Sequence, residues 1–421
     1  MTESMTARAA RTIAECRLIA TMTEEPGRIT RRFLTPPMHA VHAHLRKRME
    51  ALGMTVHLDA VGNLRGLWQP PNAKPERLVL GSHIDTVPDA GAFDGVLGVT
   101  IALEWVALAQ ELDLDLAIEV IAFSEEEGVR YAVPFLGSRA VAGIFNHAML
   151  AYEDADGIRM DDAIRAFGLD PSKIGEATLD ENVLGFVEIH IEQGPVLDTE
   201  NLPLAVVGEI IGQTRLGLRF TGQANHAGTT PMHLRRDALA AAAEWIGTVE
   251  DRIKKAAEER DPLRSDPGLV ATVGKIEIEP NAGNVIPGSV SVSLDLRAVS
   301  NRSRSRWVTE LVRDATTIAR RRGIELEWVK KMDERRVDMD KYLSLNLKLA
   351  VEAAGFPVKT MPSGAGHDAM VMAGRLPTAM LFLRSPGGIS HHPNESVREE
   401  DVEASLLVAR EFLQRLAKHI G

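Results

Sequence analysis

A histidine and an aspartate on successive loops are the first residues of this sequence that could do chemistry. His83 lies in the segment Gly-Ser-His-Ile-Asp-Thr-Val (81–87), and Asp94 follows in Gly-Ala-Phe-Asp-Gly-Val-Leu-Gly (91–98). An apolar strand is predicted at 77–80, and the glycines let both side chains converge beyond its carboxyl end, where open α/β sheets place ligands. An isolated pair of this kind is more often a buried core histidine and a capped turn. Further ligands are therefore needed to indicate a metal site.

Three more candidate ligands follow other strand-like segments: Glu127, His190 and His391. Nitrogen and oxygen donors without thiolates suit zinc or manganese, with cobalt and nickel as further possibilities, and two ions need about five or six side chains with one carboxylate shared. Asp94 is the natural bridge. Two such divalent ions supply a nucleophile at neutral pH and polarise a carbonyl group.

Glu126, next to Glu127, is the candidate general base. Adjacent residues on an extended backbone point in different directions, so one carboxylate can bind a metal while its neighbour faces the attacking water and later protonates the leaving nitrogen. The alternative for the acidic run 125–127 is a solvent-exposed loop, because acidic runs are usually exposed.

The elements that must position these residues alternate along the first half of the chain. Strands are predicted at 78–80, 116–123 and 184–191, and helices at 98–112 and from about 138. This order predicts an α/β fold with a mixed, mainly parallel sheet and helices on both faces. A helix near 343–354 and a strand at 378–383 are expected to return to the same sheet.

Residues 213–329 follow a different pattern. A strand at 214–220, a helix at 236–259, paired segments at 268–278 and 288–297, a helix at 303–322 and a strand at 324–329 give the order β-α-β-β-α-β. This resembles an inserted ferredoxin-like α+β domain. The catalytic domain is then discontinuous, with residues 1–212 and 330–421.

Composition limits the classes of partner. A net charge of -11 on 421 residues argues against nucleic acid, and no stretch is long and apolar enough for a membrane span. The single cysteine, Cys16, excludes a disulfide framework within the chain, and with the absence of a signal-peptide core it predicts a cytoplasmic protein. The early histidines His39, His42 and His44 lie on a basic helix and are predicted to be surface residues.

Several motifs together resemble the hydantoinase/carbamoylase amidases, which belong with the aminoacylase and carboxypeptidase-type two-metal hydrolases. The resemblance covers about residues 75–400. Besides the two opening segments, it rests on Glu-Glu-Glu-Gly-Val-Arg-Tyr (125–131), Glu-Ile-His-Ile-Glu-Gln-Gly-Pro (188–195), Ala-Asn-His-Ala-Gly-Thr-Thr-Pro (224–231), Pro-Ser-Gly-Ala-Gly-His-Asp-Ala (362–369) and Ser-His-His-Pro-Asn-Glu (390–395).

The resemblance implies that two ions share Asp94. His83 and His190 complete the first set of ligands, and Glu127 and His391 complete the second. His392, beside His391, is the rival for the last position.

The same resemblance implies two further roles. Glu126 is the base, and Asp85 orients the imidazole of His83 by a hydrogen bond. In peptidase relatives a carboxylate usually stands at the position of His190, so the histidine favours the amidase branch.

Four residues of the inserted domain are candidate substrate contacts: Gln213, His226, Asn284 and Arg297. Arg297 has the fixed charge that carboxylate recognition needs, although an isolated arginine at a strand end more often forms a surface salt bridge. The resemblance implies that Asn284 and Arg297 bind the substrate carboxylate and that His226 stabilises the developing oxyanion. His226 can do so only if this domain closes as a lid or a partner subunit donates it. Because related enzymes dimerise through this domain, we expect a homodimer.

These observations favour a two-metal amidohydrolase that cleaves the ureido (N-carbamoyl) C–N bond of a small carboxylate substrate. Allantoate is the first choice, and an N-carbamoyl-L-amino acid is the close second. An aminoacylase- or peptidase-type hydrolase of N-acyl amino acids or dipeptides would use the same metals. A non-catalytic binding protein of this fold would be expected to lack a ligand or the base.

Overall fold

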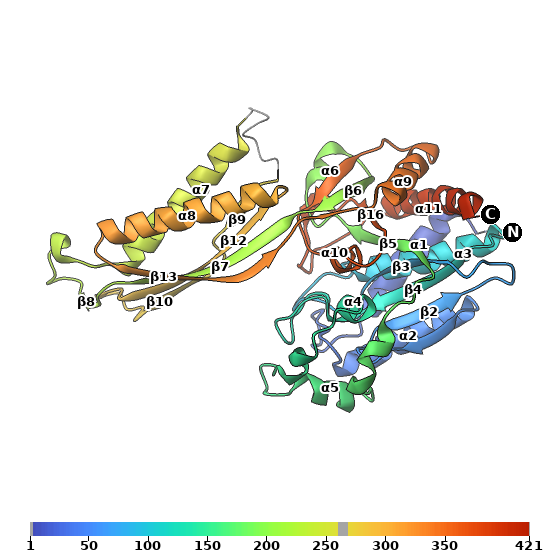
Figure 1. The fold of residues 1–421 in the computed structure, drawn as a ribbon, viewed down its shortest axis with the longest axis horizontal. Coiled ribbons are helices and arrows are strands. Elements are labelled where there is room, and N and C mark those ends of the chain that lie inside the picture. Colours follow the sequence, from blue (N-terminus) through green and yellow to red (C-terminus); the bar gives the residue numbers. More distant parts are fainter. Residues whose placement is uncertain (1–2, 260–267, 421) are drawn as a thin grey trace. The chain divides into compact units, whose positions relative to one another are not determined.

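The computed structural model describes residues 3–259 and 268–420. The chain divides into two compact units (Figure 1): unit 1 is Met1–Gly208 with Asp338–Gly421, and unit 2 is Glu209–Val337. The boundaries therefore fall after residues 208 and 337, whereas the sequence placed them after 212 and 329. The second boundary lies later because the last long strand of unit 2 continues to Glu334.

Unit 1 is built on a mixed sheet of nine strands. They are β1 Thr55–Leu58, β2 Leu64–Trp68, β3 Arg77–His83, β4 Ala117–Phe123, β5 Val183–Ile191, β6 Leu204–Ile210, β14 Val337–Asp338, β15 Thr360–Ser363 and β16 Thr378–Leu383. Their order is β1-β2-β4-β3-β5-β16-β6-β14, with β15 paired to β6. The four central strands β4, β3, β5 and β16 are mutually parallel. The mainly parallel α/β fold is thus confirmed.

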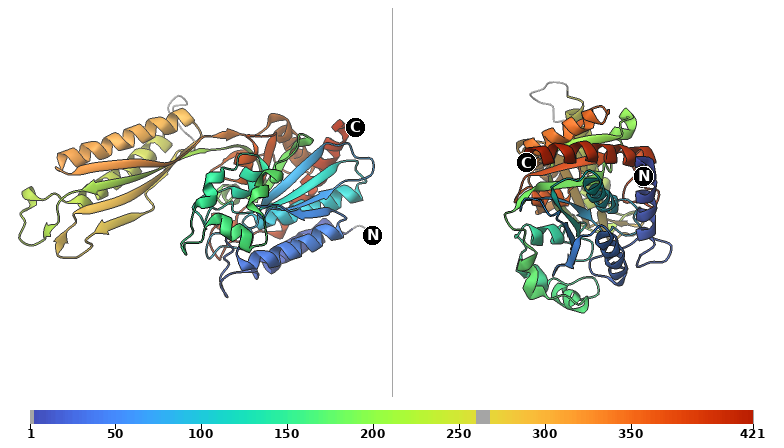
Figure 2. Two further views of the ribbon diagram at one scale, coloured as in Figure 1. Left: turned by 60° about the horizontal axis from the view of Figure 1, so that its bottom comes forward. Right: turned by 90° about the vertical axis from the view of Figure 1, so that its right-hand side faces the viewer.

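Helices lie on both sides of this sheet (Figure 2). They are α1 Met5–Ala20, α2 Pro36–Ala51, α3 Val96–Glu111, α4 Leu136–Val141, α5 Met160–Ala166, α6 Val196–Glu200, α9 Lys341–Ala353, α10 Asp368–Met372 and α11 Glu399–Ile420. Val187 and Ile189 of β5 belong to the apolar core that includes α3. Since side chains alternate along a strand, Glu188 and His190 point to the other face, where α10 packs. None of the helices in residues 3–420 that the structure describes has the length and apolar character to cross a bilayer.

The strand before the first motif is longer than predicted. The sequence ended it at Leu80, but β3 continues through Gly81 to His83. A Cβ at Gly81 would collide with the carbonyl oxygen of Ile121 on β4, so glycine lets the two strands pair closely here. His83 is therefore held by a central strand and not by a loop.

The surface position predicted for the early histidines is wrong for His42. This side chain of α2 is 6% exposed and meets the edge of the Phe167 ring, whereas His39 stacks on the same ring at 3.8 Å. Burial lowers the pKa of His42 to about 4. Nε2 of His44 lies 2.8 Å from the carboxylate of Glu15.

Unit 2 is an antiparallel sheet with two long helices. Its elements are β7 Gly212–Thr221, β8 Asn225–His226, α7 Ala238–Ala257, β9 Val270–Thr272, β10 Ile276–Glu279, β11 Val285–Ile286, β12 Ser289–Ala298, α8 Asn301–Arg321 and β13 Glu325–Glu334. The sheet order is β10-β12-β7-β13, and β8 pairs with β11 separately. Along β12, side chains alternate between buried and half-buried, because α7 and α8 pack on one face. The single strand predicted at 268–278 is in fact two, β9 and β10, which both pair with β12.

Candidate metal centre

The five predicted ligands lie together at one edge of the unit 1 sheet. His83 ends β3, His190 is the penultimate residue of β5, Glu127 follows β4, His391 follows β16, and Asp94 precedes α3. These four strands are parallel neighbours, so their carboxyl ends meet at the same edge. The strand order thus explains why residues far apart in sequence converge.

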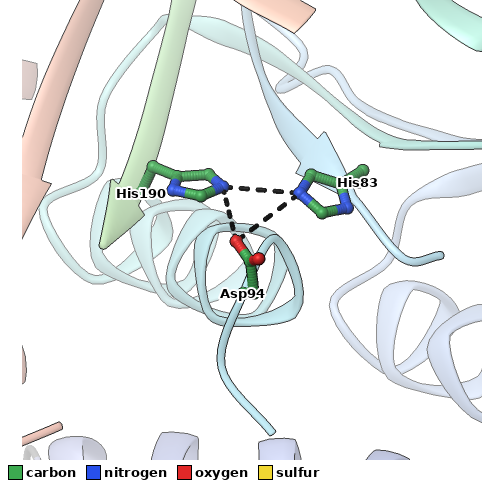
Figure 3. Close-up of side chains that lie close together, drawn as sticks. All are labelled: His83, Asp94 and His190. Carbon is green, nitrogen blue, oxygen red and sulfur yellow. Dashed lines mark hydrogen bonds and ion pairs between the residues drawn. The ribbon is translucent and has the colours of Figure 1, made fainter. Parts of the chain in front are cut away.

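The first half of the centre contains His83, Asp94 and His190 (Figure 3). Nε2 of His190 lies 3.3 Å from Oδ1 of Asp94 and 3.4 Å from Nε2 of His83, and the distance from Nε2 of His83 to Oδ1 of Asp94 is 3.9 Å. All three side chains are at most 2% exposed. A buried cluster of this size with two imidazoles and one carboxylate has the donors of a metal site.

Backbone carbonyls orient the two imidazoles. Nδ1 of His83 lies 3.1 Å from the carbonyl oxygen of Asp85, and Nδ1 of His190 lies 2.9 Å from that of Ile191. A carbonyl can only accept, so Nδ1 of each ring must donate, and each Nε2 then presents a lone pair to the centre. Both rings are therefore preset as ligands.

The second half contains Asp94, Glu127 and His391. Nε2 of His391 lies 3.0 Å from Oδ2 of Asp94 and 3.1 Å from Oε1 of Glu127. One oxygen of Asp94 thus faces each half, which is the arrangement of a bridging carboxylate. The side chain of His391 is 45% exposed, so this half reaches solvent. The neighbouring His392 is exposed, and its Nδ1 accepts a hydrogen bond from the Asn394 amide.

Histidines and carboxylates shift one another's pKa in this half. Hydrogen bonds to Asp94 and Glu127 raise the pKa of His391 to about 10. Burial alone would raise the pKa of Asp94, but His391, His190 and His83 hold it below its usual range. Asp94 is therefore an anion at neutral pH, as a bridging ligand must be.

Glu126 is buried beside the ligands, so a solvent-exposed acidic loop is the wrong interpretation. Its exposed fraction is 6%, and that of Glu125 is 0%. A ligand atom of Glu126 lies within 4.8 Å of those of His83 and Glu127. Burial and the negative charges of Glu127 and Asp368 raise the pKa of Glu126 well above its usual value. A carboxylate in such surroundings suits proton transfer.

Asp85 acts differently from the prediction. Its backbone carbonyl accepts the hydrogen bond from Nδ1 of His83, and its nearer carboxylate oxygen stays 3.7 Å from Nδ1. The carboxylate instead accepts hydrogen bonds from the amides of Glu126, at 3.0 Å, and Glu127, at 3.1 Å. Asp85 thus fixes the loop that carries Glu126 and Glu127.

The centre carries more negative charge than its surroundings compensate. No lysine or arginine in the described parts of the chain lies within ion-pair distance of Asp94, Glu126, Glu127 or Glu188, and the ion pairs of Asp94 and Glu127 are with histidines. His391 can supply only one positive charge to this group of carboxylates, and buried anions without a cation are costly. The residues present therefore fit two divalent cations, and the nitrogen and oxygen donors suit zinc or manganese.

Local backbone geometry is specialised at the same edge. Glu125, Gln193 and His391 have φ of 51°, 58° and 55°, a region that side-chain-bearing residues seldom adopt and that clusters at functional sites. A Cβ at Gly95 would lie 2.5 Å from the His83 imidazole, so only glycine permits this approach.

Three residues of the centre were missed or left without a role by sequence reasoning. Nε2 of Gln193 donates to both carboxylate oxygens of Asp94 at 3.2 Å. Glu188 accepts from the Ser82 hydroxyl and the Ala369 amide, and the buried His367 ring lies 4.5 Å from that of His190. The alternation of β5 was a usable signal, since Glu188 shares a face with His190.

The four predicted substrate contacts lie in unit 2, as two separate pairs. Arg297 and Gln213 are cross-strand partners on β12 and β7, and Arg297 also pairs with Asp295 at 3.0 Å. His226 lies on β8, and the Ala227 amide donates to the carbonyl of Asn284 at 2.9 Å. Gln213 is the second residue of β7, and His226 lies on β8, which follows the other end of β7 in the chain. The length of β7, about 25 Å of strand, therefore separates the pairs (Figure 1).

Comparison with known proteins identifies the family. Peptidase family M20/M25/M40 matches residues 79–418. Allantoate deiminase 2 of Glycine max is 39% identical, over 94% of this chain and 87% of the relative. The N-carbamoyl-L-amino acid amidohydrolase of Geobacillus stearothermophilus is 35% identical, over 93% of this chain and 94% of the relative. A solved amidase of the hydantoinase/carbamoylase family from Burkholderia multivorans has a TM-score of 0.86 and 31% identity, covering 97% of each chain.

These matches confirm the resemblance that the motifs indicated. The protein is an enzyme that hydrolyses carbon–nitrogen bonds other than peptide bonds, so the non-catalytic alternative no longer applies. The chain belongs to peptidase family M20/M25/M40 and, within it, to the hydantoinase/carbamoylase amidases.

Proposed function

We propose that this enzyme is a two-metal amidohydrolase that cleaves the ureido C–N bond of a small carboxylate substrate. Allantoate is the first substrate we propose, and N-carbamoyl-L-amino acids are the second. The observation that carries the metal chemistry is the bridging geometry of Asp94, whose two oxygens face two separate sets of ligands. Similarity to an allantoate deiminase and to an N-carbamoyl-L-amino acid amidohydrolase supports the substrate class.

Each side chain of the centre has a defined task in this proposal. His83 and His190 hold one divalent ion with Asp94, and Glu127 and His391 hold the other with the same carboxylate. Bound zinc or manganese would supply a water of lowered pKa and a polarised carbonyl group; cobalt and nickel are alternatives.

Glu126 is the proposed proton carrier. Its carboxylate accepts a proton from the attacking water and then delivers that proton to the leaving nitrogen. Burial beside Glu127 raises the pKa of Glu126, which makes the group basic enough to accept the proton. Asp85 keeps the loop in place through the amides of Glu126 and Glu127.

We also propose that substrate contacts come from unit 2 of two copies of the chain. Arg297 and Asn284 would bind the substrate carboxylate, His226 the developing oxyanion, and Gln213 would assist as a hydrogen-bonding group. A small substrate cannot span about 25 Å, so one unit 2 cannot supply both pairs. A homodimer resolves this. Strand β13 lies at the edge of the unit 2 sheet, and its residues Trp328 and Val329 are about half exposed. A second copy of the chain could pair with this edge strand.

A substrate panel tests the proposed reaction. Allantoate, N-carbamoyl-L-amino acids, N-carbamoyl-β-alanine and N-acetyl amino acids would be assayed with added manganese or zinc for ammonia and free amine. We expect turnover of ureido carboxylates, with allantoate fastest. Turnover of only N-acetyl amino acids or dipeptides would instead establish the aminoacylase- or peptidase-type alternative. A monomer mass by light scattering at assay concentration would overturn the homodimer.

A further inference from the structure

Glu395 joins the two loops that carry the bridging ligand and the exposed histidine. It lies after β16, and its exposed fraction is 6%. Oε1 accepts hydrogen bonds from the amides of Phe93, at 2.9 Å, and Asp94, at 3.0 Å, while Oε2 accepts from the hydroxyl of Ser390 at 3.1 Å. The carboxylate thus contacts the backbone of one ligand and the residue before the other, His391.

The loop before Asp94 is shaped around this carboxylate. A Cβ at Gly91 would overlap the side chain of Glu395, with its Cβ and carboxylate as the nearest atoms. Glycine at this position therefore lets the 91–94 loop close over Glu395. Two independent features therefore indicate the contact between Glu395 and the 91–94 loop: the hydrogen bonds from two backbone amides and the absence of a Cβ at Gly91.

The contacts of Glu395 differ from those of a buried carboxylate that only stabilises the fold through ion pairs. Glu395 forms no ion pair with a lysine or arginine in the part of the chain that the structure describes, unlike the buried Glu104. The side chain of His391 is 45% exposed and is held by polar contacts with Asp94, Glu127 and Gln193. The carboxylate of Glu395 ties the His391 loop to the backbone amide of Asp94, whereas Gln193 joins Asp94 and His391 through their side chains.

We propose that Glu395 is a positioning residue that sets the spacing between Asp94 and His391 and thereby the affinity of the second metal position. This inference rests on the proposed function, which takes both residues as ligands. Glu395 touches neither substrate nor reacting atoms. Its effect passes through the two loops, and groups that orient metal ligands typically change metal affinity about 10- to 100-fold.

The test measures metal affinity in the full-length protein by calorimetric titration of manganese into the metal-free form. Glu395→Ala should weaken one of two sites at least about 10-fold and leave the other near the wild-type value. Glu395→Gln should stay near wild type, because its amide oxygen still accepts from both amides and its NH2 group can donate to Ser390. Gly91→Ala displaces the Glu395 carboxylate without removing it. This variant should therefore show the same weakening of one metal site.

Hydrogen exchange of the metal-free proteins provides the second readout. Amides of the 91–94 loop should lose protection in Glu395→Ala and keep it in Glu395→Gln. Glu104→Gln is the matched control, since it also alters a buried carboxylate of unit 1 but should leave both metal affinities unchanged.

The outcomes separate the inference from the proposed function. Two sites of wild-type affinity in Glu395→Ala and Gly91→Ala would overturn the positioning role while leaving the two-metal proposal intact. Equal weakening of both sites in Glu395→Ala would show general damage and would also overturn it. If the wild-type protein binds fewer than two ions, the two-metal proposal fails, and this inference fails with it.

Discussion

Two buried carboxylate clusters in unit 1 differ in how their charge is compensated. Glu104 on α3 is 1% exposed and lies 3.1 Å from Arg8, 2.6 Å from Arg11 and 3.1 Å from Arg48. At the candidate centre, Asp94 is 2% exposed and Glu127 is 11% exposed, and their ion-pair partners in the described residues are histidines only.

The difference shows that burial alone does not mark a functional carboxylate. The arginines of the first cluster come from α1 and α2, so their bonds to Glu104 link these helices to α3. The second cluster lacks such partners, and the divalent ions that we propose would balance its charge. We therefore interpret the Glu104 cluster as structural and the centre as a binding site.

Chelation should have the largest effect on activity. Removing divalent ions leaves the carboxylates of the centre uncompensated and removes the Lewis acid, so we expect complete loss of turnover, restored by one added divalent ion. Product formation before and after dialysis against a chelator measures this. Full activity in the metal-free protein would show that the cluster around Asp94 needs no metal ion for catalysis and would contradict its separation from the Glu104 cluster.

Glu126→Gln should lower kcat about 10²- to 10⁴-fold, because the amide cannot accept the proton of water. The bound metal content should not change, since Glu126 is not a ligand in this account. Steady-state kinetics and elemental analysis of the same sample check both statements. Wild-type turnover with metals bound would show that another group transfers the proton.

Glu104→Gln should lower the stability of the protein and leave its activity unchanged. It removes the carboxylate that the arginines on α1 and α2 share, although Arg8, Arg11 and Arg48 each keep at least one other carboxylate partner. The free energy of unfolding should therefore fall by about 2 kcal/mol. Turnover and metal content of the folded fraction should equal those of the wild type. Denaturant unfolding gives the first quantity. A loss of metal binding would show that the clusters are coupled and would contradict their separation.

His42 represents a third case, a buried titratable group that belongs to neither cluster. Its pKa falls from 6.5 to about 4 on folding, because burial disfavours the cation and His39 and Arg46 add positive charge. Below pH 6.5 the unfolded chain binds a proton that the folded chain excludes, so stability falls as the pH drops toward 4. Between pH 7.5 and pH 5 the wild type should lose about 2 kcal/mol more than His42→Leu. Equal losses in denaturant unfolding would show that His42 has an ordinary pKa.

The sequence predicted which side chains would lie together at this edge, because strand ends and motifs are local signals. His83 and His190 follow apolar runs, and a parallel sheet must bring such ends together. Glu395 and the true role of Asp85 were not predictable, since each depends on a side chain meeting backbone amides from another segment. The buried position of His42 also depends on tertiary packing, in this case against Phe167. The separation of the unit 2 pairs became visible only with the strand register.

The most direct test of the account is the number of divalent ions bound per chain at saturation. Equilibrium dialysis with elemental analysis should give two for the wild type and for Glu104→Gln. For Asp94→Asn, which removes the bridging charge, it should give fewer than two at the same free concentration. One ion or none in the wild type, or two in Asp94→Asn with unchanged affinity, would contradict the claim that an uncompensated cluster around Asp94 is a two-metal site.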